Sequence, residues 1–261
     1  MIQNVPSIYN AQSIYNGGGG GGEFTAEING VKSNLFFPPY LTPVEYIDTS
    51  DMTATNFCLR GSKQFTLDPN DEIVTVVSFD TSKIINNGDR IFTTTLALGN
   101  GGYNSTIDVL VTPNKKFQVY YGSIQTSLTG SNIHTDDRVT IRLKLSNKTL
   151  YVTDQHGNIH TYQSNSGYNT PLQGAYSVFG FAQQSPTYPY HGKFLYSYIR
   201  NNDKVKAGFF PARNKENNLP YIVEVTDGSV ATNWTNSVNP AGVVFGPDVD
   251  LKAVAAALEQ L

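Results

Sequence analysis

GKFLYSYIRNNDKVKAGFFPARNKENNLPYIVEV, residues 192–225, carries the clearest strand and turn signals of the chain. Its runs KFLYSYIR and KVKAGFF are rich in aromatic and β-branched residues, which favour strands, and the Asn/Asp turn at 201–203 separates them. Pro211 has no amide hydrogen, so we expect the second strand to end before it. Phe209 and Phe210 should point to opposite faces of that strand, one of them into the core. These residues therefore predict two strands joined by a tight turn.

Similar apolar runs bounded by turn residues occur along most of the chain, at 72–79, 91–98, 106–112, 117–121 and 176–182. Over residues 138–145 apolar and polar residues alternate strictly, which is typical of a strand with one buried face. Residues 138–154 predict a hairpin, and the turn at 155–158 leads into a further strand. Strands at this spacing, with little helix between them, predict an all-β, antiparallel sandwich.

The composition of the 261 residues agrees with a folded β domain: 39% are hydrophobic and 12% aromatic, but only 15% are charged. The net charge of −3 and the lack of a basic block argue against a nucleic-acid partner. No apolar run approaches 18–20 residues, so we expect no membrane insertion. Cys58 is the only cysteine, which excludes an intrachain disulfide, and we expect it to be a small buried side chain.

Three segments resemble a known family: EYIDT at 45–49, the stretch 192–225, and TNSVNPAGVVFGPDV at 235–249. They are similar to the laminin-G-like, concanavalin A-like jelly-roll domains of bacteriophage fibres and appendages and of gut-bacterial surface proteins. The resemblance covers roughly residues 45–249 and implies a jelly-roll β-sandwich, without specifying an activity. We expect the sandwich domain to span residues 23–248. The sequence departs from the family pattern at Glu224, where the family usually has a G-L-Y-D stretch.

Residues 1–22 do not look like part of a globular domain. SIYN occurs at 7–10 and again at 13–16, and Gly17 to Gly22 follow as an unbroken glycine run. Only an extended segment projects residues six apart in the same direction, and polyglycine behaves as a flexible tether. We therefore predict an anchoring arm that docks on a partner through four apolar side chains: Ile8, Tyr9, Ile14 and Tyr15. The alternative is a disordered tail with a chance repeat.

Residues 249–261 predict a short C-terminal helix. Leu251, Val254, Leu258 and Leu261 form one apolar stripe, and Asp250 is suited to cap the first turn. A helix this short must pack on something. We expect it to support a homo-oligomer, with a trimer favoured. The segment AAALE also resembles a remnant of an expression vector, so a non-native tail is the alternative.

No catalytic or metal-binding constellation is evident. A glycoside hydrolase needs two carboxylates on either side of the scissile bond, but the acidic clusters lie in turns, where acids are mostly solvated or capping: Asp68, Asp71, Glu72, Asp136 and Asp137. His156 and His160 flank a predicted turn and lack further ligands, so surface histidines are expected. No catalytic residue, metal site or cofactor is predicted. Calcium would suit the Asp-rich loops, without an indicated site.

The strongest candidate for ligand recognition is the loop QQSPTYPYH at 183–191. Tyr188 and Tyr190 lie beside prolines, next to His191, and Tyr103 lies in the loop NGGYN. Tyrosines held in this way offer an apolar face and a polar tip, which suits sugar rings or a protein partner. The alternative is that these tyrosines pack on their own domain.

These features together predict a non-enzymatic structural protein of a bacteriophage virion: a head fibre, capsid decoration or tail appendage. The arm would bind other virion proteins and the sandwich would face outward, where it could contact a surface glycan. The first residues resemble no secretory signal, so we expect synthesis in the host cytoplasm. A glycan-binding module of an extracellular or bacterial surface protein is the alternative, and a glycoside hydrolase is the third candidate.

Overall fold

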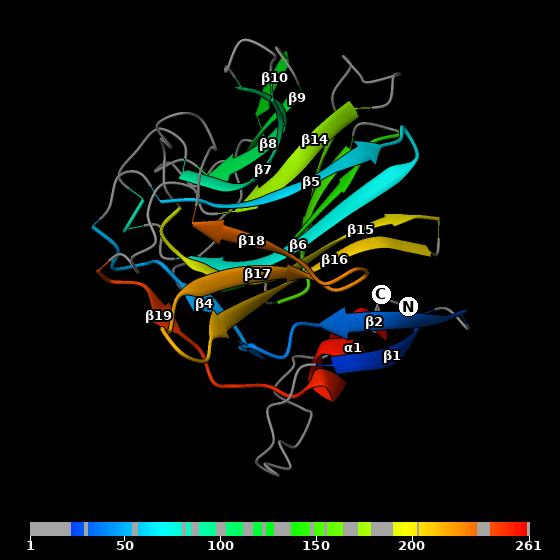
Figure 1. Ribbon diagram of the computed structural model, residues 1–261. Coiled ribbons are helices and arrows are strands. Elements are labelled where there is room, and N and C mark those ends of the chain that lie inside the picture. Colours follow the sequence, from blue (N-terminus) through cyan, green and yellow to red (C-terminus); the bar gives the residue numbers. More distant parts are fainter. Residues whose placement is uncertain are drawn as a thin grey trace.

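The computed structural model describes the parts of the chain in which the strands and the helix lie (Figure 1). These parts are residues 22–28, 31–53, 57–79, 82–84, 89–97, 103–111, 117–121, 124–127, 137–146, 149–153, 156–163, 172–178, 190–202, 204–233 and 241–259. Every strand pairing among them is antiparallel. The predicted all-β jelly-roll sandwich with a short C-terminal helix is confirmed.

One sheet of the sandwich is built around β6. Its strands follow the order β13 (Ile159–Gln163), β12 (Thr149–Thr153), β11 (Asp137–Lys144), β6 (Asp71–Phe79), β15 (Lys193–Asn201), β16 (Lys204–Asn214) and β17 (Pro220–Glu224). The short strands β3 (Leu41–Pro43) and β4 (Ile47–Asp48) pair with β16 and β15, and β19 (Val244–Phe245) pairs with β4.

The second sheet contains β5 (Leu59–Leu67), β14 (Leu172–Val178), β7 (Asp89–Ala97), β8 (Tyr103–Val111), β9 (Phe117–Tyr121) and β10 (Ile124–Ser127), in this order. β18 (Ser229–Asn233) connects the two sheets, because its first half pairs with β17 and its second half with β5. The sandwich is therefore continuous through β18.

The main core lies between the sheets and follows the alternation expected from the sequence. Val139, Ile141 and Leu143 of β11 are fully buried in it, as predicted for residues 138–145. Cys58 is also buried, as predicted. The predicted hairpin at 138–154 corresponds to β11 and β12.

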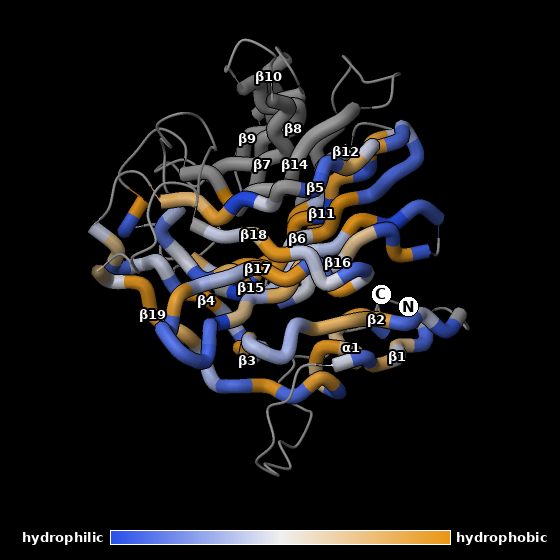
Figure 2. The backbone as a smooth tube through the Cα atoms, in the orientation of Figure 1, coloured by the Kyte–Doolittle hydropathy of each residue, from blue (hydrophilic) through white to orange (hydrophobic). Residues whose placement is uncertain are grey.

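A third layer covers part of the outer face of the β6 sheet, over β6, β15, β16 and β17. It consists of the hairpin β1 (Gly22–Ile28) and β2 (Val31–Phe37), which is separate from the sandwich, and of α1 (Leu251–Glu259). Figure 1 shows the three elements together on one side of the molecule, next to β16. Hydrophobic stretches of β2 and α1, visible in Figure 2, join a second core with outward-facing residues of β6, β15, β16 and β17. The domain predicted over residues 23–248 thus starts with a hairpin that lies in this separate layer, and the strands of the sandwich follow it.

The helix is capped as predicted, since Asp250 Oδ1 accepts a hydrogen bond from the amide of Ala253 at 2.8 Å. Its apolar face is buried within the same chain, with Val254 and Leu258 in the second core. The helix is therefore not free to join copies of the chain through that face, and our expectation of a helix-mediated trimer loses its basis. No helix in the described parts is both long and apolar enough to span a membrane.

Phe209 and Phe210 confirm the prediction of opposite faces: Phe209 lies in the main core and Phe210 in the second core. The expected strand end before Pro211 is wrong, because β16 continues to Asn214. On one side of β16 the pairing with β15 ends at Phe209, and the pairing with β3 begins at Ala212. The Pro211 carbonyl accepts a hydrogen bond from Val44 on this side. The missing amide hydrogen thus falls in the gap between two neighbouring strands.

Candidate functional site

Tyr190 is a core residue, so its prediction as a ligand contact is wrong. Its side chain is 0% exposed, and its hydroxyl donates to the Ser78 carbonyl at 2.9 Å. Its own carbonyl accepts from Thr49 Oγ1 at 2.7 Å, and its ring meets Phe79 edge-on. The neighbouring His191 is buried as well. The contacts of Tyr190 hold the segment before β15 against the sandwich, and neither residue lines a surface.

The other predicted contact residues are placed only in part. Tyr103 begins β8 and pairs in register with Ala97 of β7. Five residues lie outside the described parts of the chain: Tyr188, Ile8, Tyr9, Ile14 and Tyr15. For these six residues the ligand and partner roles stay predictions.

The acidic turn at 68–72 is not simply solvated, which corrects our expectation. Asp71 is buried, and its Oδ2 lies 2.6 Å from Lys206 Nζ, which also contacts Asp68 at 2.8 Å. Asp71 Oδ1 accepts a hydrogen bond from Asn201 at 2.8 Å. Asp71 also caps its own turn through the amide of Asp68, as expected for a turn acid. Both oxygens of this carboxylate thus join the turn to β15 and β16.

Glu72 is occupied in the same way. Its Oε2 lies 2.5 Å from Arg200 Nε in β15, and its Oε1 lies 3.1 Å from Arg142 Nε in β11. The side chain of Glu72 is 9% exposed. One carboxylate thus connects three neighbouring strands, so its contacts are structural.

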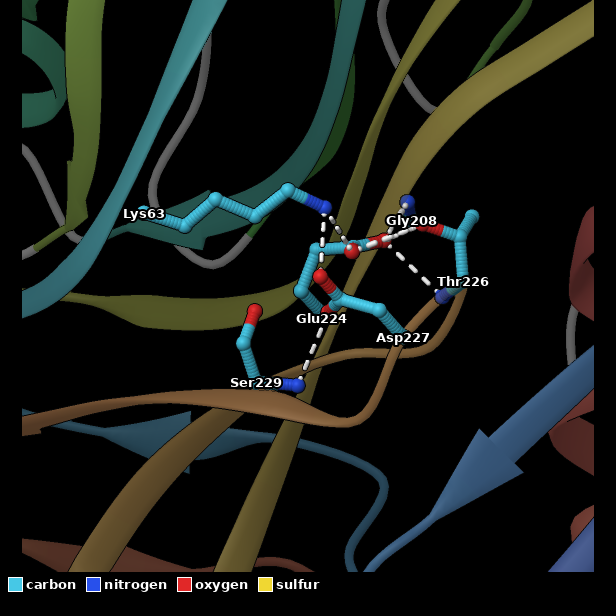
Figure 3. Close-up of polar contacts among 6 residues, drawn as sticks. All are labelled: Lys63, Gly208, Glu224, Thr226, Asp227 and Ser229. Carbon is cyan, nitrogen blue, oxygen red and sulfur yellow. Dashed lines mark hydrogen bonds and ion pairs between the residues drawn. The ribbon is translucent and has the colours of Figure 1, made fainter.

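A second polar cluster centres on Glu224, a residue that the sequence marked only as a departure from the family pattern. Figure 3 shows Lys63 reaching from β5 toward two carboxyl groups that come from the end of β17 and the turn after it. Lys63 Nζ lies 3.1 Å from Glu224 Oε2 and 2.6 Å from Asp227 Oδ2. Thr226 donates to Glu224 from both its amide and its hydroxyl. Glu224 is only 3% exposed.

The environment separates the ionisation of the two acids. Burial raises the pKa of Glu224, and a hydrogen bond with Asp227 raises it further. For Asp227, burial opposes ionisation, but hydrogen bonds from Lys63 and Glu224 outweigh it and hold its pKa below the usual range. Glu224 therefore takes up a proton at a higher pH than an ordinary glutamate, and Asp227 stays ionised to a lower pH than an ordinary aspartate.

This cluster does not fit a glycosidase. Carboxylates that hydrolyse a glycosidic bond stand about 5–9.5 Å apart, so that the bond or a water fits between them. Glu224 and Asp227 instead both contact the same ammonium group, that of Lys63, at 3.1 and 2.6 Å. The arrangement joins β5, β17 and the turn before β18, which is a structural task.

The described residues contain no group of three or more His, Cys, Asp or Glu side chains arranged to hold a metal ion. His156 is exposed in the turn that contains Gly157.

No protein-family model and no curated protein match the sequence. Among solved structures, the fold is similar to a legume lectin-like domain from Entamoeba histolytica, at 11% identity and a TM-score of 0.41, over 62% of this chain and 88% of that one. It is also similar to a heptameric SAP-like pentraxin from Limulus polyphemus, at 13% identity and a TM-score of 0.39, over 60% and 76%. A Trypanosoma rangeli sialidase mutant matches at 14% identity and a TM-score of 0.37, over 50% and 20%. Likenesses at this level carry no argument about ligand or activity.

Proposed function

We propose that the protein is a non-enzymatic structural component of a bacteriophage virion, such as a head fibre, capsid decoration or tail appendage. Residues 1–16 attach the chain to other virion proteins, and the sandwich is displayed outward. Assembly with the particle takes place in the host cytoplasm.

The observation that carries this proposal is that the glycine run leads directly into a strand of the folded domain. The glycine run ends at Gly22, the first residue of β1, and β1 belongs to the layer that packs on the sandwich with α1. Ala26 of β1 is buried in the second core, and the Glu27 amide donates to Glu259 of α1 at 2.9 Å. An arm that enters a packed layer can hold the whole domain on a particle.

The acidic residues support a non-enzymatic role. Asp71, Glu72 and Glu224 are buried and each is ion-paired with lysine or arginine within the fold. Neutralising any of them removes a structural contact and not a reacting group.

The energetics of docking favour several arms acting together. Burying each of the four apolar side chains of the SIYN repeats yields about 1.5–3 kcal/mol. Ordering the arm costs about 1–2 kcal/mol for each residue, which cancels most of this gain. Strand pairing with a partner edge, or several copies on one particle, would supply the remaining affinity.

The test is deletion of residues 1–16 in the parent phage, with quantitative mass spectrometry of purified particles. The truncated protein should keep the circular dichroism spectrum and melting temperature of the full chain but be missing from particles. Replacing Ile8, Tyr9, Ile14 and Tyr15 by Ser should have the same effect, whereas replacing the Ser and Asn residues of both repeats by Ala should not. Normal incorporation of the truncated protein would overturn the proposal.

A further inference from the structure

The outer face of β11, β12 and β13 differs in chemistry from the rest of the β6 sheet. Because the odd-numbered residues of β11 point into the main core, its even-numbered residues, including Arg142 and Lys144, point outward. Tyr151 of β12 is paired with Arg142 on one side and with Thr161 of β13 on the other. Five residues make up what we call the basic face: Arg142, Lys144, Tyr151, Thr153 and Thr161.

The third layer does not bury the basic face. Among the described residues, the second core includes members of β3, β6, β15, β16 and β17, together with the hairpin and α1, and none of β11, β12 or β13. The side chain of Arg142 is 41% exposed, and Thr161 is exposed as well. In the described residues, this part of the sheet remains accessible from outside.

The charge of the basic face is positive. β12 and β13 contain no acidic residue, and among the described residues the nearest outward carboxylate is Glu72 of β6, opposite Lys144 in register. Glu72 is shared between Arg142 and the closer Arg200. Lys144 and the outer nitrogens of Arg142 therefore provide a local excess of cations in a chain whose net charge is −3.

An aromatic ring lies beside these cations, on the neighbouring strand. Lys144 Nζ is 5.6 Å from the centre of the Tyr151 ring, and Thr153 lies two residues further along β12. Strands are about 4.8 Å apart and alternate residues about 7 Å apart, so the face measures about 10 Å across and 7–14 Å along the strands. These dimensions match a short oligosaccharide lying flat on the sheet.

We propose that the basic face binds an acidic glycan. A sugar ring packs on Tyr151, Arg142 and Lys144 bind its carboxylate or sulfate, and the hydroxyls of Thr153 and Thr161 bind its hydroxyl groups. The inference rests on the proposed function in one respect, since it names the ligand class of the displayed sandwich.

The experiment is isothermal titration of the full-length protein with three glycans: a heparin-derived octasaccharide, an oligogalacturonate and a neutral maltooligosaccharide. One or both acidic glycans should bind, with an affinity that falls as salt is raised, and the neutral one should not. The two acidic ligands distinguish sulfate from carboxylate recognition. Tyr151→Ala should weaken binding about tenfold and Lys144→Ala about threefold.

The matched controls are Tyr40→Ala and Lys204→Ala, which alter an exposed tyrosine and an exposed lysine away from the basic face. The inference is overturned if the controls lose as much affinity as the basic-face variants, or if neither acidic glycan binds. Tighter binding of the neutral glycan, or of polyadenylate titrated in the same way, would also overturn it. Deletion of residues 1–16 should leave the titration unchanged. Loss of particle incorporation together with normal glycan binding, or the reverse, therefore separates the two proposals.

Discussion

The ammonium group of Lys63 in β5 lies 3.1 Å from Oε2 of Glu224 in β17, so one ion pair spans the start of β18. β18 pairs with Glu224 through Ser229, and with β5 through Ala231 opposite Gly61. Lys63 follows Gly61 by two residues, at the point where β5 has separated from β18. The ion pair holds β5 and β17 together where the backbone pairing between the two sheets stops.

Glu224→Gln should change how stability depends on pH. Burial raises the pKa of Glu224, so its contribution is fully present below the pKa of the unfolded chain, about 4.3, and is lost as pH rises through the folded value. Asp227 has a lowered pKa, so its contribution to stability is lost only as pH falls below about 4. The two acids therefore affect stability in different pH ranges. We expect the free energy of unfolding of the wild type to fall from pH 4.5 upward more steeply than that of the variant, measured by urea denaturation.

The control for this measurement is Glu216→Gln, since Glu216 is exposed in a turn. Its pH profile should follow that of the wild type. Parallel profiles for the wild type and Glu224→Gln between pH 4.5 and 8 would show that Glu224 titrates as a solvated acid.

Tyr190→Phe should destabilise the fold without affecting ligands. The substitution keeps the ring but removes the hydroxyl that donates to the buried Ser78 carbonyl. The expected loss is about 1 kcal/mol, the usual net contribution of such a hydrogen bond. Tyr40→Phe, at an exposed tyrosine, should cost close to nothing in the same denaturation experiment. A loss of glycan affinity in Tyr190→Phe at unchanged stability would return this residue to the ligand site.

The sequence predicted those features that depend on local periodicity. The alternation of apolar and polar residues identified the buried face of β11. Phe209 and Phe210 were assigned to opposite faces because successive side chains of a strand point in opposite directions. The proline rule failed at Pro211 because its cost depends on the neighbouring strands, which one segment does not reveal.

The candidate sites were harder to predict, because their contacts join distant parts of the chain. Lys63 and Glu224 are 161 positions apart, and a single acid within a strand produces no pattern. Tyr190 was expected at the surface because of its prolines, but Thr49 and Ser78, far away in sequence, enclose it. The one feature of the sequence that pointed to the polar cluster was Glu224, which departs from the family pattern.

Gly228→Ala should be destabilising for two reasons that can be separated. Gly228 has a φ of +73°, and a Cβ there would lie 2.2 Å from Cδ1 of the Phe36 ring. The backbone strain costs about 1–2 kcal/mol, and displacement of the ring adds to it. Thermal denaturation of Gly228→Ala with and without Phe36→Ala measures the second part, because the double variant has no ring to displace.

Gly157→Ala is the matched control, with a φ of +82° and, among the described residues other than its chain neighbours, no atom within 4 Å of the added Cβ. It should show the backbone cost alone. If Gly228→Ala costs no more than Gly157→Ala, the contact with Phe36 is not rigid enough to matter.

Leu258→Ala tests whether α1 stabilises its own chain or joins copies. Leu258 is fully buried, and it packs so closely on β16 that a Cβ at Gly208 would lie 3.3 Å from its Cδ2. Truncation in such a site costs about 2–5 kcal/mol. We expect this loss in urea denaturation at every protein concentration, with the mass in analytical ultracentrifugation unchanged, whereas Lys252→Ala on the exposed side should do neither. A helix that joined copies would instead give a lower mass for Leu258→Ala and a wild-type stability that rises with protein concentration.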